Sequence, residues 1–346
     1  MSWAEDIAIC RRMLQGGSKT FFAASKVLPR AVGDPAIALY AFCREADDAI
    51  DGPGRRVDAV EMLHERLDRI YDGVPDDSPV DRALAGVVGH FVIPRALLEA
   101  LLEGLAWDVQ GRRYETLSDV LAYAVRVAGT VGVMMSLLMN RREAETIGRA
   151  CDLGIAMQLT NIARDVGEDA RLGRLYLPQQ WLREAGLDVE TWRAAPFFDD
   201  RIGRVTARLL AVADVFYARA AAGITDLPWS CRPGIHAARL IYAEIGREVA
   251  RAEFDSMSQR AVVSMARKLQ LLGKAAAVSV LQEPCSLAPL RPEARILIDA
   301  VIAVDAQRPH PIAARRRTMQ DRALWVLDLF ERLERRDQLS RSGRTS

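Results

Sequence analysis

The sequence predicts an all-α protein that folds as one large helical domain. Apolar residues recur at spacings of three and four along nearly the whole chain of 346 residues, and no strand-like alternation persists. Alanine and leucine, which favour helices, are plentiful. No linker rich in proline and serine separates two halves, and a chain of this length can bury enough surface to enclose a central cavity.

Short breaks divide the chain into its expected helices. Asp34-Pro35 predicts an N-cap and a first helical residue, and Gly52-Pro53-Gly54 ends that helix at Asp51. Further breaks are expected at Gly73-Val74-Pro75, Ser78-Pro79 and Gly111. Helices are expected over 118–139 and 143–169, from near residues 201, 232 and 265, and over 318–335, with a loop over 173–178. We expect one domain over residues 1–335 and a frayed polar tail over 336–346.

The charge balance and the cysteines restrict the class of protein. The formal net charge is only +1, which argues against a protein that binds nucleic acid. The five cysteines are dispersed and form no CxxC pair, which indicates a reducing compartment. The N-terminus lacks the pattern of a signal peptide, and apolar stretches such as 127–139 are too short to span a bilayer. We therefore expect a cytoplasmic protein.

Two segments carry polar and acidic residues at helical spacing. The first set, in residues 40–51, recurs at four, three and four: Tyr40, Arg44, Asp47 and Asp51. The second set, in residues 158–169, recurs at three, four and four: Gln158, Asn161, Asp165 and Asp169. Each set, called a stripe below, lies on one face of a helix that is apolar around most of its remaining circumference. One aspartate pair four residues apart is typical of a solvated helix face, but two stripes of one period favour a site that faces the inside of the bundle.

The chemistry of the stripes predicts a metal–diphosphate site. Facing carboxylates repel one another and need cations, and oxygen ligands without cysteine or histidine suit Mg²⁺ or Mn²⁺. Such ions commonly bridge protein carboxylates to a substrate phosphate, and Arg44 and Arg164 supply donors to the same oxygens. Loss of diphosphate from an allylic carbon leaves a carbocation, which requires a dry, aromatic-lined cavity. Candidates for that lining are Phe21, Phe22, Tyr40, Phe42, Tyr123 and Tyr242.

At these residues the sequence resembles the squalene/phytoene synthase family, most closely its bacterial phytoene synthases, over roughly residues 10–275. The first stripe resembles the family's first aspartate-rich motif, and residues 161–169 resemble the second. Residues 17–22, 127–132, 156–160 and 173–178 fit as well. One departure is Tyr123-Ala124-Val125, where the family often has Tyr-Cys-Tyr, so only Tyr123 is carried over.

The resemblance implies an isoprenoid synthase fold and assigns roles to individual residues. The implied metal ligands are Asp47, Asp51, Asn161, Asp165 and Asp169. The implied diphosphate contacts are Ser18, Lys19, Arg44, Gln158 and Arg164. Tyr40, Tyr123, Tyr242 and Phe21 are expected to line the cavity or contact substrate, with Arg174 and Tyr176 near the second motif.

The resemblance also implies the reaction. The family condenses two prenyl diphosphates head to head through a cyclopropyl intermediate, and we expect two geranylgeranyl diphosphates to give phytoene, a step of carotenoid biosynthesis. No GxGxxG sequence occurs, so we expect no NADPH site and a redox-neutral finish. An apolar product partitions into lipid, so we expect peripheral contact with a membrane. The basic segment 314–317 is interpreted first as an ordinary solvated helix start, and contact with a membrane is the weaker alternative for it.

Three alternatives remain open. The enzyme could prefer C15 substrates and form dehydrosqualene or squalene, because periodicity cannot measure cavity depth. A di-metal carboxylate bundle needs two Glu-x-x-His motifs, and the chain has only the one at Glu61–His64. A family-like bundle without activity, acting as an assembly factor, predicts broken aspartate motifs, whereas both motifs here are complete.

Overall fold

The computed structural model describes residues 2–17, 27–51, 56–280 and 289–307, and these residues are mainly helical and contain no strand. Met1–Ala303 form one compact unit and Val304–Ser346 a second, of which residues 304–307 are described. The predicted all-α fold is confirmed. The predicted domain boundary at residue 335 and the helix over 318–335 lie outside the described residues.

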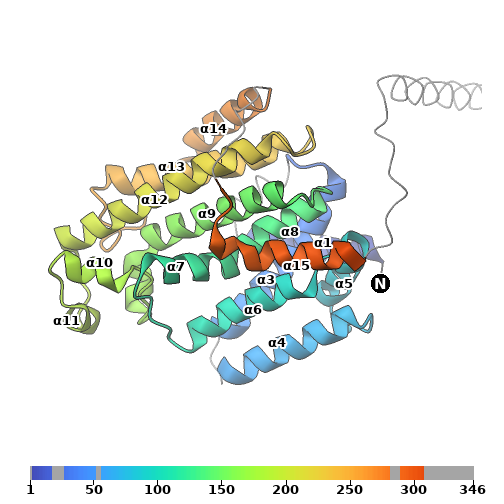
Figure 1. Cartoon of the computed structure of the whole chain (residues 1–346), viewed down its shortest axis with the longest axis horizontal. Coiled ribbons are helices and arrows are strands. Elements are labelled where there is room, and N and C mark those ends of the chain that lie inside the picture. The colour runs from blue at the N-terminus through green and yellow to red at the C-terminus, as the bar shows by residue number, and fades with distance from the viewer. Residues whose placement is uncertain (1, 18–26, 52–55, 281–288, 308–346) are drawn as a thin grey trace, which may run out of the picture. The chain divides into compact units, whose positions relative to one another are not determined.

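The first half of the chain, residues 3–171, supplies eight of the described α-helices. Its helices are α1 (Trp3–Gly17), α3 (Arg30–Asp51), α4 (Arg56–Tyr71), α5 (Pro79–Phe91), α6 (Arg95–Val109), α7 (Leu117–Ala124), α8 (Thr130–Leu138) and α9 (Ala144–Arg171). The later helices are α10 (Gln179–Glu184), α11 (Val189–Ala194), α12 (Asp200–Ile224), α13 (Arg232–Arg251), α14 (Met265–Val278) and α15 (Arg295–Gln307), the last preceded by a 3₁₀ turn, Pro292–Ala294. The long helix α9 packs against α8, α12 and α13 (Figure 1).

The helix α9 is central because its apolar residues surround most of its circumference. Ile155, Leu159, Ile162 and Val166 are all buried in the core. The apolar residues of α3, such as Phe42 and Ala46, are buried as well. Burial of the apolar faces of both stripe-bearing helices was predicted and is confirmed, since a helix that is apolar on most sides must pack on most sides.

Most predicted breaks are confirmed. Ser78 is the N-cap of α5, because its hydroxyl accepts a hydrogen bond from the Val80 backbone N–H at 3.2 Å. Gly73 and Gly111 follow α4 and α6 with φ of 78° and 62°, a left-handed backbone that glycine adopts without steric cost. The segment 173–178 contains no helix, as predicted.

The predicted start of the first stripe-bearing helix is wrong. Helix α3 begins at Arg30, and Pro35 lies inside it. The Pro29 carbonyl already accepts hydrogen bonds from the backbone N–H groups of Val32 and Gly33, so the first turn forms before Asp34. The Asp34 carboxylate is instead paired with Arg11 of α1 at 2.5 Å.

The predicted helix over 118–139 is interrupted in a way that periodicity did not indicate. A π-helical turn, Val125–Gly129, joins α7 to α8. A π turn holds one more residue per hydrogen-bonded ring than an α turn, and such turns occur frequently at functional sites. Here the turn carries Val127 and Ala128, which both line the cavity described next.

Candidate active site

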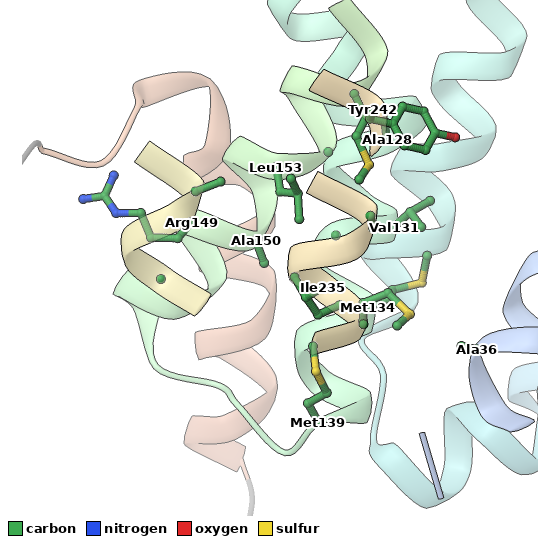
Figure 2. A pocket seen from close by; sticks show the side chains of 18 of the residues that line it. Ala36, Ala128, Val131, Met134, Met139, Arg149, Ala150, Leu153, Ile235 and Tyr242 are labelled. Atoms are coloured by element: carbon green, nitrogen blue, oxygen red, sulfur yellow. The ribbon is translucent and has the colours of Figure 1, made fainter. Parts of the chain in front are cut away.

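A mostly apolar cavity of about 310 Å³ lies among α3, α8, α9, α12 and α13. Figure 2 shows the labelled side chains of Val131 and Met134 from α8, Leu153 from α9, and Ile235 and Tyr242 from α13 around one hollow. These elements are separated by up to about two hundred residues in the sequence, so only the folded chain brings them together.

The cavity follows one face of α9 for most of the length of that helix. Its lining residues there recur at spacings of one, three and four: Asn161, Gln158, Met157, Gly154, Leu153, Ala150, Arg149 and Thr146. The Arg149 guanidinium turns away from the hollow (Figure 2) toward Asp152 at 3.2 Å and Glu145 at 2.8 Å. Asn161 and Gln158 therefore mark a polar end, and the wall between them and Arg149 is apolar.

Two glycines let the walls approach closely. A Cβ on Gly132 of α8 would lie 2.2 Å from the Ala150 carbonyl oxygen, and one on Gly154 of α9 would lie 2.2 Å from the Ala128 carbonyl oxygen. Both distances are far below van der Waals contact, so α8 and the π turn touch α9 backbone to backbone.

The polar end contains an amide oxygen without a partner. The Asn161 side chain donates to the Gln158 amide oxygen at 3.4 Å, whereas its own Oδ1 atom is buried and accepts no hydrogen bond from any described residue. A buried polar atom without a partner is unfavourable by about 1–3 kcal/mol, so this atom suits a ligand that is a cation or a donor.

Asp165 is held by two arginines. Its Oδ1 atom accepts hydrogen bonds from the Arg164 Nε and the Arg260 Nε, each at 2.7 Å. Burial alone would raise the pKa of Asp165, but these two guanidinium groups outweigh it and lower that pKa. Arg260 also lies 3.2 Å from Glu168. The sequence reading missed Arg260, because 95 residues separate it from Asp165 and no motif surrounds it.

Asp169, one turn later, has the opposite electrostatic environment. Burial and the neighbouring carboxylates of Asp165 and Asp108 raise the pKa of Asp169 to about 7, although Arg174 opposes them. A carboxylate in this position is stabilised in its charged form by any cation that enters the site.

A further carboxylate, Asp108 of α6, was also missed. It accepts hydrogen bonds from the hydroxyls of Tyr123 at 2.8 Å and Tyr176 at 2.7 Å, and the two phenol rings stack with centroids 5.0 Å apart. Burial raises the pKa of Asp108 to about 6, and the charge of Asp47 contributes in the same direction. Asp108 thus interacts electrostatically with both Asp47 of the first stripe and Asp169 of the second.

The first stripe is only partly turned inward. Tyr40 lines the cavity together with its α3 neighbour Cys43, and Tyr40 also interacts electrostatically with Tyr242 across the cavity. The side chains of Arg44 and Asp47 are 43% and 50% exposed, so the prediction that this stripe avoids water is wrong for them. Charged groups retain hydration where no buried partner replaces it, which places these residues at a solvent-accessible rim.

The remaining predicted residues lie in several different parts of the molecule. Tyr40, Gln158, Asn161 and Tyr242 line the cavity. Tyr123 and Tyr176 lie outside that lining, around Asp108, and Phe42 is fully buried in the core. Arg174 lies in a smaller surface pocket with Tyr176. Ser18, Lys19 and Phe21, and the side chain of Asp51, fall outside the described residues.

Among the described residues, no three acidic, histidine or cysteine side chains are close enough to enclose a metal ion as they stand. The donor set nevertheless fits Mg²⁺ or Mn²⁺, because every candidate ligand atom is an oxygen and the Asn161 Oδ1 has no partner. His64 of the rival di-metal motif lies on α4 and does not line the cavity.

The prediction that the apolar stretches are too short to span a bilayer is wrong for one described helical run, Leu117–Leu138, which is long and apolar enough to cross a membrane. It comprises α7, the π turn and α8, and 61% of its most apolar window is buried inside the protein. Because it packs against α6 and α9, its hydrophobicity is that of a core helix.

The comparisons with known proteins agree with this geometry. The family model for squalene/phytoene synthase matches residues 14–267. The phytoene synthase of Cereibacter sphaeroides is 48% identical, covering 97% of this chain and 96% of that protein, and the phytoene synthase of Rhodobacter capsulatus is 51% identical over 85% of this chain and 89% of that protein. A ligand-bound dehydrosqualene synthase crystal structure superimposes with a TM-score of 0.73 at 31% identity, covering 80% of this chain and 96% of its own. The chain is therefore a prenyltransferase-type enzyme of the squalene/phytoene synthase family.

Proposed function

We propose that the chain is a phytoene synthase, which joins two geranylgeranyl diphosphates head to head through prephytoene diphosphate in carotenoid biosynthesis. The observation that supports this function is a long, mostly apolar cavity whose two amide side chains, Gln158 and Asn161, lie at the end nearest the second stripe. A prenyl diphosphate has the same polarity, since one end is a dianionic or trianionic headgroup and the rest is hydrocarbon. The relatives named phytoene synthase add independent support.

The length of the cavity supports a C20 substrate. Asn161 and Thr146 lie fifteen residues apart on α9, which is about 22 Å along the helix axis. An extended chain advances about 1.2 Å per bond, so four isoprene units reach about 19 Å and three reach about 14 Å. A C20 chain therefore uses nearly the whole wall, whereas a C15 chain would leave its far end empty.

The residues of the polar end bind and orient the headgroups in this proposal. Gln158, Asn161 and Arg164 donate to diphosphate oxygens at the second stripe, and Arg44 does so at the rim. Further contacts come from Ser18, Lys19, Arg174 and Tyr176. The phenol rings of Tyr40 and Tyr242 and the aliphatic walls exclude water from the allylic carbocation, and the faces of those rings stabilise its positive charge.

We propose that Mg²⁺ or Mn²⁺ binds at Asp47, Asp51, Asn161, Asp165 and Asp169. When bound, these ions supply positive charge that makes the diphosphate a better leaving group. The protein's own part is to hold Asp165 ionised through Arg164 and Arg260.

The reaction is balanced without a reductant. In the first step C1 of the donor bonds to the acceptor double bond, and one diphosphate and one proton leave as the cyclopropane closes. In the second step the other diphosphate leaves, the ring rearranges and a proton is lost to give phytoene. We propose accordingly that the enzyme uses no NADPH.

Product analysis tests this function. The purified protein is incubated with Mg²⁺ and either geranylgeranyl or farnesyl diphosphate, and the hydrocarbon product is identified by mass. We expect phytoene from the C20 substrate, and reversible loss of turnover on addition of EDTA. A C30 product formed in preference would assign the chain to the dehydrosqualene or squalene type instead, and absence of any product would favour an inactive binding factor.

We also propose that the enzyme acts in the cytoplasm, at the surface of a membrane. The described cysteines Cys10, Cys43, Cys151 and Cys231 are free thiols, in keeping with a reducing compartment. Substrates with C20 tails and a C40 hydrocarbon product partition into lipid, so a surface that contacts the bilayer shortens their transfer.

A further inference from the structure

Helix α14 presents an apolar face to the outside of the molecule. Met265 and Leu269 of the helix are 66% and 61% exposed, and Val262 and Val280 just beyond its ends are 71% and 66% exposed. Between them the exposed positions are mainly small or apolar: Ala266, Gln270, Gly273, Ala276 and Ala277. We call this set the α14 face. An amphipathic surface helix normally turns such residues toward the core, so their exposure calls for a partner.

The α14 face is distinct from the side by which the helix packs on the core, because a second apolar side of the helix is buried. Leu271 and Ala275 pack there against Ala237, Leu240 and Ile241 of α13. The helix is further anchored by Arg267, whose guanidinium Nε donates to the buried Glu244 of α13 at 2.9 Å. The exposed face is therefore held rigidly outward.

Two lysines, Lys268 and Lys274, stand on the same helix. They are two of the four lysines of the whole chain, and neither forms an ion pair with any residue that the structure describes. An apolar stripe accompanied by unneutralised positive charge is the pattern of helices that lie in the interface of an anionic membrane.

The helix also lies one helix away from the reaction cavity. Helix α13 contributes Ile235, Ala238 and Tyr242 to the cavity, and it contributes Ala237 and Ile241 to the contact with α14. Figure 1 shows α14 as the outermost helix beside α13. A bilayer against the α14 face would therefore lie close to the cavity that holds the C20 chains.

We infer that the α14 face is the surface by which the enzyme docks on an anionic lipid bilayer. This inference rests on the proposed function, because it names the surface through which the enzyme meets the membrane. The lysines favour lipid over a second copy of the chain, since two copies paired through this face would bring their positive charges together.

Vesicle sedimentation of the full chain tests the inference. The vesicles are phosphatidylcholine, with or without a quarter of phosphatidylglycerol. We expect Met265→Glu/Leu269→Glu to lower the partition coefficient at least tenfold on both kinds of vesicle. Lys268→Ala/Lys274→Ala should lower it about fivefold per lysine on the anionic vesicles only. The matched control is Met62→Glu/Val215→Glu, which places two glutamates on exposed apolar residues of α4 and α12 and should bind as the unmodified chain does.

Three results would overturn the inference. One is that the double glutamate variant on α14 binds vesicles as tightly as the unmodified chain. Another is that the unmodified chain is a dimer in solution which this variant converts to monomers, because the face is then an interface between copies. The third is a marked fall in the melting temperature of this variant, which would show that another part of the chain covers the face.

Turnover in detergent separates this inference from the proposed function. Met265→Glu/Leu269→Glu leaves the cavity and both stripes untouched, so we expect its turnover in detergent micelles to equal that of the unmodified chain while its vesicle binding is lost. If neither protein turns over geranylgeranyl diphosphate, the proposed function fails, yet the vesicle result still decides the role of the α14 face.

Discussion

Asp165 and Asp169 stand one helical turn apart, and their surroundings shift their pKa values in opposite directions. Arg164 and Arg260 hold Asp165 ionised, whereas burial and neighbouring carboxylates raise the pKa of Asp169 to about 7. The described side chains therefore supply enough positive charge for one of the two carboxylates. The cation proposed for this site would complete the charge balance, so we expect removal of metal to stop turnover.

Asp47 and its neighbour Asp48 offer a matched pair of variants. Both are about half exposed and both contact Arg44, at 3.7 Å and 3.0 Å, but only Asp47 lies on the stripe. We expect Asp47→Asn to lower kcat about 10²–10³-fold, the size of the loss when one group that stabilises transition-state charge is removed from an active site. Asp48→Asn should retain most of the activity. The measurement is kcat at saturating geranylgeranyl diphosphate across a Mg²⁺ titration; equal losses in both variants would contradict the assignment of the stripe.

Single residues were predictable where the signal was local. The stripes were found because spacings of three and four are fixed by the helix itself, and Asn161 and Gln158 did prove to line the cavity. Arg260 and Asp108 were not found, because their partners lie 95 residues away for Arg260 and 15 and 68 residues away for Asp108. Contacts across such separations depend on how the helices pack.

At the level of whole helices, the contact of α8 and the π turn with α9 fixes one wall of the cavity. We expect Gly154→Ala to destabilise the protein by about 1–3 kcal/mol, because the new Cβ must displace the Ala128 carbonyl from a distance of 2.2 Å. Gly89→Ala is the control: Gly89 lies in α5 with open space around it, so alanine should be neutral or stabilising by up to about 1 kcal/mol. Urea unfolding measures the free energy of unfolding of both variants. If Gly154→Ala is as stable as the unmodified chain, the π turn and α9 can move apart at little cost.

The attachment of α14 to α13 predicts a pH dependence. Glu244 is fully buried, and although burial raises its pKa, hydrogen bonds from Arg267, Arg247 and Arg251 lower it to about 2. The lowered pKa stabilises the fold fully above the ordinary value near 4.5, and this contribution is lost as the pH falls from there through about 2. Since the arginines are partly exposed, we estimate its size as about 1–3 kcal/mol.

Urea unfolding at pH 7 and pH 3 checks this dependence. We expect Glu244→Gln to be less stable at pH 7 and to lose less stability than the unmodified chain on going to pH 3. Glu248→Gln, on the same helix and paired among the described residues with Arg251 alone, should follow the unmodified chain. The same pH dependence in Glu244→Gln and the unmodified chain would exclude Glu244 as its source.

Helices were predicted well where their ends carry side-chain or glycine signals, as at Ser78 and Gly111. The start of α3 was misplaced because Asp34 pairs with Arg11 of another helix, which the local sequence does not reveal. The six-residue helices α10 and α11 were missed, since fewer than two turns hold too little periodicity. The sequence did not indicate the π turn, because one extra residue in a hydrogen-bonded turn hardly changes the spacing of the apolar residues.

The whole molecule adds one property that no single helix has, the depth of the cavity. The sequence predicted an enclosed pocket but left C15 and C20 substrates open, because depth depends on where five separate elements meet. Several expected aromatic residues proved to lie elsewhere, Phe42 in the core and Tyr123 beside Asp108. Leucine, isoleucine, valine, methionine and alanine residues together supply most of the described wall instead, which suits a long flexible hydrocarbon.

The depth of the cavity predicts that a large side chain at Ala150 changes the substrate preference. Ala150 lines the cavity eleven residues before Asn161 on α9, about 16 Å from the polar end. This position lies beyond the reach of an extended C15 chain, about 14 Å, and within the reach of a C20 chain, about 19 Å. Ala150→Phe should therefore lower kcat/KM for geranylgeranyl diphosphate at least tenfold and leave that for farnesyl diphosphate nearly unchanged.

Competition between the two substrates, with the products separated by mass, measures this shift within one sample. The farnesyl rate of the variant is the internal control, because a general packing defect would lower both rates together. Ala150→Ser changes the polarity of the position with little change in volume, so it should keep the original preference and distinguish a steric effect from a polar one. If Ala150→Phe still prefers the C20 substrate, the chains do not extend along this wall of α9, and the link between cavity depth and chain length is lost.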